Sequence, residues 1–72
     1  MNYYEVHVKY NSKNGFSVFY KDNSMNEPNS DDIASHACNK GLIEPDDLGY
    51  VDYTAKIQKS EYDEAMKGKP KA

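Results

Sequence analysis

Hydrophobic and polar residues alternate along residues 3–10 and again along 16–21, on either side of an Asn14-Gly15 pair. A period of two is typical of a strand with one buried face. Asn-Gly between two such runs favours a hairpin, because both residues tolerate positive φ. In the first run one side holds Tyr4, Val6, Val8 and Tyr10, and the other holds Tyr3, Glu5, His7 and Lys9. In the second run one side holds Phe16, Val18 and Tyr20, and the other holds Ser17, Phe19 and Lys21.

The length of the hairpin loop decides whether the two apolar sets share a face. A two-residue Asn14-Gly15 loop puts them on opposite faces, whereas a three-residue loop over residues 13–15 keeps them together. A slip of one residue would expose a whole buried face. We therefore predict the three-residue loop, with Gly15 left-handed and a bulge. The predicted pairs are Ser12 with Phe16, Tyr10 with Val18, and Val8 with Tyr20.

A helix is predicted over residues 31–40, after a polar, turn-rich loop over 22–29. Ser30 is a suitable N-cap, and acidic residues occupy the first turn, where they complement the helix dipole. Gly41 stands where a left-handed residue closes a helix, and Leu42 supplies the accompanying apolar contact. The apolar stripe of this helix consists of Ile33, Ala34, Ala37 and Cys38.

The C-terminal part of the chain predicts a turn, a third strand and a short helix. Residues 44–49 form the turn, and alternation over 51–57 indicates the strand. Ser60 is the expected cap of a helix over 61–67, with Asp63 as its capping-box partner and Gly68 at its end. A helix of two turns is stable only when its apolar residues dock on another element. Those residues are Tyr62, Ala65 and Met66.

The predicted fold is therefore α+β with the order ββαβα: a three-stranded antiparallel sheet, order 2-1-3, with one main helix on one face and a short C-terminal helix. Residues 1–68 form a single small domain, and residues 69–72 form a flexible basic tail. The main helix is expected to cover one face of the sheet. That face would consist of Val6, Val8, Tyr10, Phe16, Val18, Val51, Tyr53 and Ile57.

Composition places the chain among small proteins without a large core. Seventy-two residues with 38% hydrophobic content form a thin core. The single cysteine, Cys38, excludes an intramolecular disulfide. No apolar run approaches the ~20 residues of a membrane span, and no secretory leader pattern precedes the first strand. We expect a cytoplasmic protein.

The net charge of −3 conceals a segregation along the chain. Residues 22–52 hold eight acidic residues against one lysine, while the flanking segments are each basic by two charges. There is no arginine, the residue that most often grips phosphate groups and guanine edges, which disfavours specific nucleic-acid recognition.

The sheet face opposite the main helix is the first candidate binding surface. Large rings surrounded by charged residues are typical of the centre of a protein-binding surface. Two other interpretations remain: aromatic residues that only stabilise the strand ladder, and the interface of a homodimer. The residues expected to contact a protein partner here are Tyr3, Glu5, His7, Phe19 and Tyr50. Lys9, Lys21, Asp52, Thr54 and Lys56 are expected to share the face with them.

Acidic residues of the central segment form the second candidate surface. Asp31 and Asp32 lie at the start of the main helix, and Asp46 and Asp47 lie in the following turn with Glu44. The plain interpretation is a helix cap and a solvated turn. The alternative is a negative patch that meets a basic partner surface, such as the nucleic-acid channel of an enzyme that the protein inhibits.

Catalysis, cofactors and metals find no support in the sequence. His36 and Cys38 lie two residues apart on a helix and therefore point to different faces, and no CxxC pair is present. Cys38 belongs to the apolar stripe, which predicts a small core residue. We therefore expect a non-enzymatic protein with no cofactor and no metal.

The functional expectation is a protein-binding module. In its size, its acidity and its lack of catalytic motifs, the chain resembles small accessory proteins of phages and mobile elements; the resemblance is one of type and rests on no particular residues. It implies an inhibitor or modulator that occludes a surface of a host protein, such as a nucleic-acid-handling or defence enzyme, for example a CRISPR effector. The alternatives are single-stranded nucleic-acid binding through aromatic residues on an open sheet face, and a structural homodimer.

Overall fold

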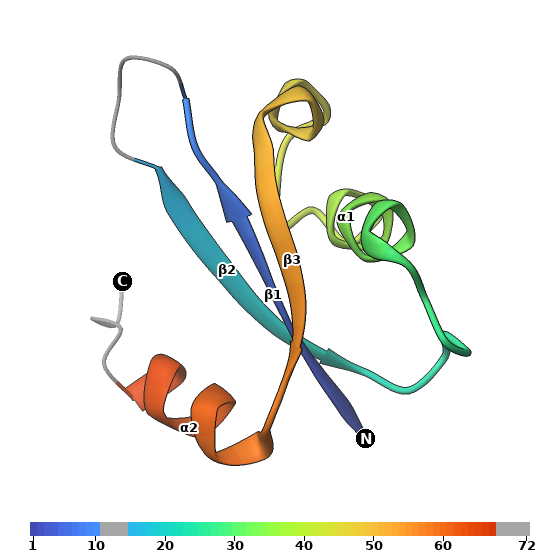
Figure 1. Cartoon of the computed structure of the whole chain (residues 1–72), viewed down its shortest axis with the longest axis vertical. Coiled ribbons are helices and arrows are strands. Elements are labelled where there is room, and N and C mark those ends of the chain that lie inside the picture. The colour runs from blue at the N-terminus through green and yellow to red at the C-terminus, as the bar shows by residue number, and fades with distance from the viewer. Residues whose placement is uncertain (11–14, 68–72) are drawn as a thin grey trace.

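In the part of the chain that the structure describes, three antiparallel strands, two α-helices and a 3₁₀ helix build the domain (Figure 1). The computed structural model describes residues 1–10 and 15–67. The strand order β2-β1-β3 and the α+β class agree with the prediction from the sequence. Along the chain the elements are β1 (Asn2–Val8), β2 (Phe16–Asp22), α1 (Ser30–Asn39), the 3₁₀ helix η1 (Pro45–Tyr50), β3 (Val51–Ile57) and α2 (Lys59–Lys67).

Helix α1 begins and ends with local hydrogen bonds that the sequence encodes. Its N-cap is Asn29, one residue before the predicted Ser30, because Asn29 and Asp32 bond each other's backbone N–H groups in a capping box. At the other end Gly41 has φ +80°, as predicted. The Gly41 and Leu42 N–H groups donate to the carbonyls of Cys38 and Ala37, which is a Schellman closure. Leu42 remains 39% exposed, and the buried apolar residue after the helix is Ile43.

The core lies between α1 and one face of the sheet, which we call the α1 face. It consists of Tyr4, Val6, Val8 and Tyr20 from the strands, with Ile33, Ala37 and Ile43 packed on them. The Tyr20 hydroxyl donates to the Ile33 carbonyl at 3.1 Å. Burial raises the pKa of Tyr20 to about 12, because its environment disfavours a phenolate. The predicted helix stripe and strand alternation are thus confirmed for these residues.

The register between β1 and β2 corrects the predicted hairpin. Val8 pairs with Phe16, and Tyr4 pairs with Tyr20, so each predicted pair is wrong by four residues. A shift by an even number of residues leaves the apolar sets on one face, and alternation alone therefore could not reveal it. Residues 9–15 separate the strands, and most of the predicted loop lies outside the described residues.

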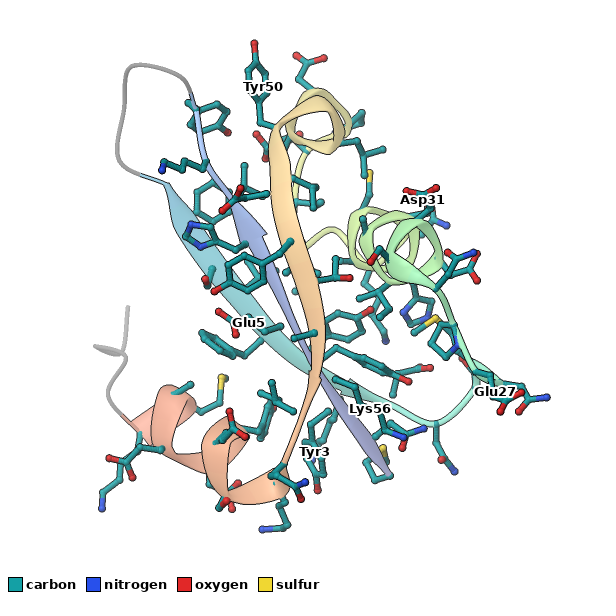
Figure 2. All side chains as sticks on the ribbon, viewed as in Figure 1. Tyr3, Glu5, Glu27, Asp31, Tyr50 and Lys56 are labelled. Atoms are coloured by element: carbon teal, nitrogen blue, oxygen red, sulfur yellow. The ribbon has the colours of Figure 1, made fainter. Side chains whose placement is uncertain are left out.

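A bulge between β1 and β3 corrects the predicted face of β3. Val8 pairs with Val51, but His7 pairs with Tyr53, so Asp52 is an extra residue at the His7/Val8 step. Beyond the bulge the alternation is reversed. Tyr53 and Ile57 therefore lie opposite the α1 face on which they were predicted, while Thr54 and Lys56 lie on it. Figure 2 shows Lys56 and Glu5 on opposite sides of the sheet.

The second face of the sheet carries α2, and we call it the α2 face (Figure 1). Helix α2 begins at Lys59, before the predicted Ser60, and Asp63 accepts a hydrogen bond from the Lys59 ammonium group at 2.7 Å instead of completing a capping box. Gly68 and residues 69–72 lie outside the described residues. The side chains of the α2 face are Tyr3, Glu5 and His7 of β1, Ser17, Phe19 and Lys21 of β2, and Tyr53, Ala55 and Ile57 of β3.

Candidate functional site

Four side chains of the α2 face form a connected polar network across all three strands. The register sets His7 between Ser17 of β2 and Tyr53 of β3. Glu5 Oε2 accepts hydrogen bonds from the Tyr53 hydroxyl at 2.9 Å and from Ser17 Oγ at 3.0 Å. Ser17 Oγ also lies 2.8 Å from His7 Nδ1. The His7 and Tyr53 rings are stacked, with their centroids 5.0 Å apart.

The direction of these bonds follows from the number of protons available. Ser17 has one hydroxyl proton, which it donates to Glu5, so the bond with His7 requires a proton on Nδ1. Tyr53 likewise donates to Glu5, and this bond is the main reason that the pKa of Tyr53 is raised. The Glu5 carboxylate thus accepts from two hydroxyls: it binds Tyr53 directly and is linked to His7 through Ser17.

The network differs from the arrangement of a nucleophilic triad. In a triad the histidine accepts the serine proton and an acid orients the histidine. Here Ser17 lies between the acid and the imidazole, donates to Glu5 and accepts from His7. What the arrangement can do is present pre-positioned aromatic and imidazole rings, with Tyr53 46% exposed.

Helix α2 covers one end of the α2 face, which corrects the expectation that Tyr3 and Phe19 are fully open. The Tyr62 ring packs on the Tyr3 ring at 4.9 Å, with an interplanar angle of 44°. Both Tyr3 and Phe19 are half-buried. The sequence indicated the cause, since α2 must dock its apolar residues to persist, but not the place of docking.

A groove of about 560 Å³ lies between α2 and the sheet. Its apolar lining comes from one residue of each element, Phe19 of β2, Ile57 of β3 and Ala65 of α2. Polar residues complete the lining: Glu5, Ser60, Glu61 and Glu64. Two of the residues predicted from the sequence, Glu5 and Phe19, therefore meet at this groove.

Tyr50 does not belong to the same surface as the other predicted aromatic residues. It ends η1, at the opposite end of the sheet from Tyr3 (Figure 2). Its ring packs on Tyr10 at 4.9 Å, and Tyr10 in turn lies 6.4 Å from Phe16. With 43% of its surface exposed, Tyr50 belongs to a separate aromatic cluster beside η1.

The predicted acidic patch is divided between two helix starts. Asp31 and Asp32 are exposed in the first turn of α1, where Asp32 also serves the cap. Asp46 is exposed at the start of η1. Asp47 is only 7% exposed, so the expectation of a solvated residue is wrong for it.

Asp47 joins η1 to the end of β1. It accepts hydrogen bonds from the Tyr10 hydroxyl and, at 2.9 Å, from the Glu44 N–H group. The bond to Asp47, more than burial, raises the pKa of Tyr10 to about 12. Asp47 is thus a structural acceptor that fixes the 3₁₀ helix against the sheet.

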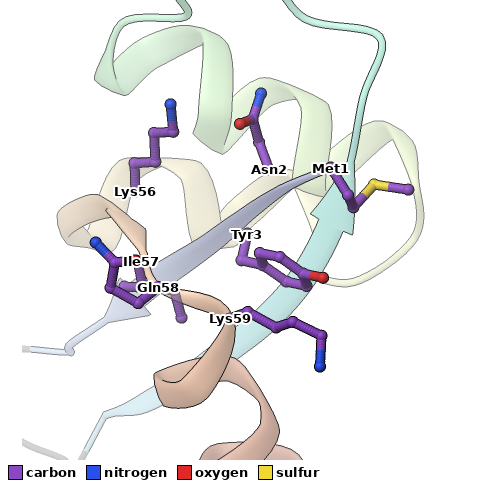
Figure 3. A pocket seen from close by; sticks show the side chains of 7 residues that line it. All are labelled: Met1, Asn2, Tyr3, Lys56, Ile57, Gln58 and Lys59. Carbon is purple, nitrogen blue, oxygen red and sulfur yellow. The ribbon is translucent and has the colours of Figure 1, made fainter.

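A second hollow of about 450 Å³ lies at the β3–α2 junction (Figure 3). It is lined by Met1, Asn2, Tyr3, Lys56, Ile57, Gln58 and Lys59. The ammonium groups of Lys56 and Lys59 point away from each other, and Lys59 is bonded to Asp63. The two lysines therefore do not converge on one anion.

The sequence missed Ser17 and Tyr53 as members of the candidate site. Ser17 could have been found, because it alternates on the same side of its strand as Phe19. Tyr53 could not, because its face depends on the bulge opposite His7. Glu61 and Glu64 were likewise outside the predicted set, since the site of α2 docking has no local signal.

Within residues 1–10 and 15–67, no three His, Cys, Asp or Glu side chains are grouped so that they could hold a metal ion. The helices of this described part include none long and apolar enough to cross a membrane. The chain has no match among protein families, curated proteins or solved structures. Its class therefore rests on its own architecture: a small α+β domain with an antiparallel sheet.

Proposed function

We propose that this chain is a non-enzymatic protein-binding module, an inhibitor or modulator that acts by occupying a surface of a partner protein through its α2 face. The observation that carries the proposal is the network of Glu5, Ser17, His7 and Tyr53, which holds an exposed tyrosine ring in one position. Tyrosine is among the residues that contribute most to protein interfaces, because its ring is large and its hydroxyl polar.

Pre-positioning supports binding because less conformational freedom is lost when the partner docks. The Tyr53 hydroxyl is tied to Glu5, and its ring is stacked on His7. A ring that is already held in place costs less entropy on association than one that must be ordered. Tyr53 is thus suited to act as the anchor of the contact.

The uneven charge supports the choice of a basic partner. Residues 22–52 carry eight acidic residues and one lysine, and most of the acidic side chains of this segment are exposed. A concentrated negative charge accelerates the approach of a positively charged partner and suppresses encounters with acidic ones. Occlusion of a basic surface on a nucleic-acid-handling enzyme is the form of inhibition that this charge favours.

Two tyrosines of nearly equal exposure give a matched test of the α2 face. Tyr53 on that face is 46% exposed and Tyr50 beside η1 is 43% exposed. In a pull-down from host lysate, we expect Tyr53→Ala to lower recovery of a partner about tenfold or more, as for an interface anchor. Tyr50→Ala should recover as much partner as the unmodified chain. Equal recovery by all three chains, or a loss with Tyr50→Ala alone, would exclude the α2 face as the contact surface.

Single-stranded nucleic-acid binding is less well supported by the same face. Its rings would have to stack on bases, but one side of the Tyr53 ring is already occupied by His7. Among the strand lysines, the register places Lys21 on this face, while Lys56 lies on the α1 face, and Lys59 of α2 is bonded to Asp63. An anisotropy titration with a short oligonucleotide at low salt separates the two functions. Binding that weakens steeply as salt is added would favour nucleic acid over a protein partner.

A further inference from the structure

The groove under α2 combines an apolar floor with an acidic rim. Phe19, Ile57 and Ala65 supply the apolar surface, from three different elements. The rim carries three carboxylates, Glu5, Glu61 and Glu64, and none of the residues that line the groove is basic. A pocket of about 560 Å³ lies in the range that binds small organic groups or the side chains of a peptide.

Within the described residues, none of the three rim glutamates forms an ion pair within 4.0 Å. The hydrogen bonds that Glu5 accepts come from the uncharged hydroxyls of Ser17 and Tyr53. Among the described residues, the two charge pairs within 4.0 Å are Lys59 with Asp63 and His36 with Asp22, and neither involves a rim glutamate. The rim therefore places three carboxylates without an ion-pair partner in the described part of the chain around an apolar centre.

We propose that this groove receives a short segment of the partner protein in which an apolar side chain is flanked by lysine or arginine. This inference rests on the proposed function and specifies the part of the partner that is recognised. The apolar side chain would contact Phe19, Ile57 and Ala65, and the flanking cations would pair with the rim glutamates. Apolar burial supplies affinity, and the opposite charges supply selection and register.

A second copy of this chain fits the groove less well. In a two-fold dimer the same surface lies on both sides of the interface, so the three rim glutamates would face those of the other copy. Like charges in such close opposition disfavour association. The charge of the rim thus points to a basic partner.

The test uses the isotope-labelled full chain and three short blocked peptides. One peptide has a central leucine flanked by lysines, the second replaces the leucine with serine, and the third replaces the lysines with glutamates. We expect the first peptide to shift the backbone amide resonances of Phe19, Ile57 and Ala65, with binding that weakens as salt rises. The serine and glutamate peptides should bind at least about tenfold more weakly. Shifts of the same size with all three peptides, or shifts confined to other elements, would overturn the inference.

Charge variants test the rim with a matched control. Glu61→Lys/Glu64→Lys should weaken binding of the leucine–lysine peptide about tenfold or more. Glu27→Lys/Asp52→Lys changes the net charge equally but removes only long-range attraction, so it should weaken binding by less than about twofold. Glu27 lies in the loop before α1, far from α2 (Figure 2). Glu61→Gln/Glu64→Gln is the second rim variant; it keeps good helix-forming residues, and circular dichroism confirms that α2 is retained. Equal effects of the rim and control pairs would contradict a role for the rim.

The outcomes separate this inference from the proposed function. If recovery of the partner depends on Tyr53 while neither the peptides nor the rim variants matter, the groove inference is wrong and the proposed function stands. If the leucine–lysine peptide binds in the groove while Tyr53→Ala leaves recovery of the partner unchanged, the groove inference stands and Tyr53 is not the anchor of the proposed function. A dimer in sedimentation equilibrium that Glu61→Gln/Glu64→Gln abolishes would assign the groove to a second copy and overturn the inference.

Discussion

Replacing Gly15 with alanine tests the β1–β2 register on which the α2 face depends. A Cβ atom at this position would lie 2.0 Å from the Val8 carbonyl oxygen and 2.9 Å from the Lys9 Cα atom. An ordinary carbon–oxygen contact is about 3.3 Å, so the added methyl group would overlap the oxygen by about 1.3 Å. The colliding atoms belong to the backbone of β1 and its continuation, which cannot move aside without loss of strand pairing.

The expected cost is a large share of the stability of the domain. At about 0.05–0.15 kcal/mol per residue, 72 residues give a free energy of unfolding of about 4–11 kcal/mol. Overpacking costs about 1–3 kcal/mol, and a collision with backbone belongs at the upper end of that range. We therefore expect Gly15→Ala to lower the free energy of unfolding by about 3 kcal/mol.

Two other glycines provide controls with different physical causes. At Gly49 a Cβ atom would have no neighbour within 4 Å, so Gly49→Ala should change the free energy of unfolding by less than about 0.5 kcal/mol or stabilise slightly. At Gly41 the space is equally open, but φ is +80°. Gly41→Ala should therefore cost about 1 kcal/mol through backbone strain alone.

Urea denaturation followed by far-ultraviolet circular dichroism measures the series. With a slope of about 1 kcal/mol per molar urea for a chain of this size, Gly15→Ala should lower the midpoint by about 3 M. We expect Gly49→Ala to be the most stable of the three variants, Gly41→Ala to be intermediate and Gly15→Ala to be the least stable. A Gly15→Ala protein as stable as the Gly49→Ala protein would refute the close approach of Gly15 to Val8, and with it the register.

Three further predictions concern tyrosines in different environments. The pKa of Tyr10 is about 12 in the folded chain and near 10 in the unfolded chain, so the contribution of this tyrosine to stability should be complete below pH 10 and lost as the pH rises towards 12. Tyr10→Phe, which also removes the bond to Asp47, should reduce this alkaline loss of stability in pH-dependent denaturation, and an unchanged profile would contradict the bond. The buried Tyr4 hydroxyl has no hydrogen-bond partner among the described residues, so Tyr4→Phe should be neutral or stabilise the fold by about 1 kcal/mol. Tyr20→Phe loses the hydrogen bond to α1 and should lower the free energy of unfolding by about 1 kcal/mol, and a Tyr20→Phe protein more stable than Tyr4→Phe in urea denaturation would exclude this account. Tyr62→Ala should lower the free energy of unfolding by about 1–2 kcal/mol and reduce the helical circular dichroism signal, because a nine-residue helix is not stable without its docking contact. An undiminished signal would show that other contacts hold α2.

Local sequence determined the elements and their order. Alternation over β1 and β2, and the apolar stripe of α1, each depend on residues close together in the chain. The structure confirms the pattern of β1 and α1, but in β2 only Tyr20 is buried and Phe16, predicted on the covered face, is 38% exposed. Gly41 closes α1 because only a residue without a side chain adopts positive φ at little cost. Eight of the nine predicted contact residues, all except Asp47, are exposed or half-exposed, as local sequence indicated.

Tertiary structure decided the composition of the candidate site, for three physical reasons. Alternation has a period of two, so it cannot distinguish a register from one shifted by four residues. One extra residue at the bulge reverses the alternation of β3, which moves Tyr53 and Ile57 to the α2 face and completes the network around Glu5. The docking of α2 on Tyr3, which creates the acidic groove, joins residues nearly sixty positions apart, and no local pattern specifies such a contact.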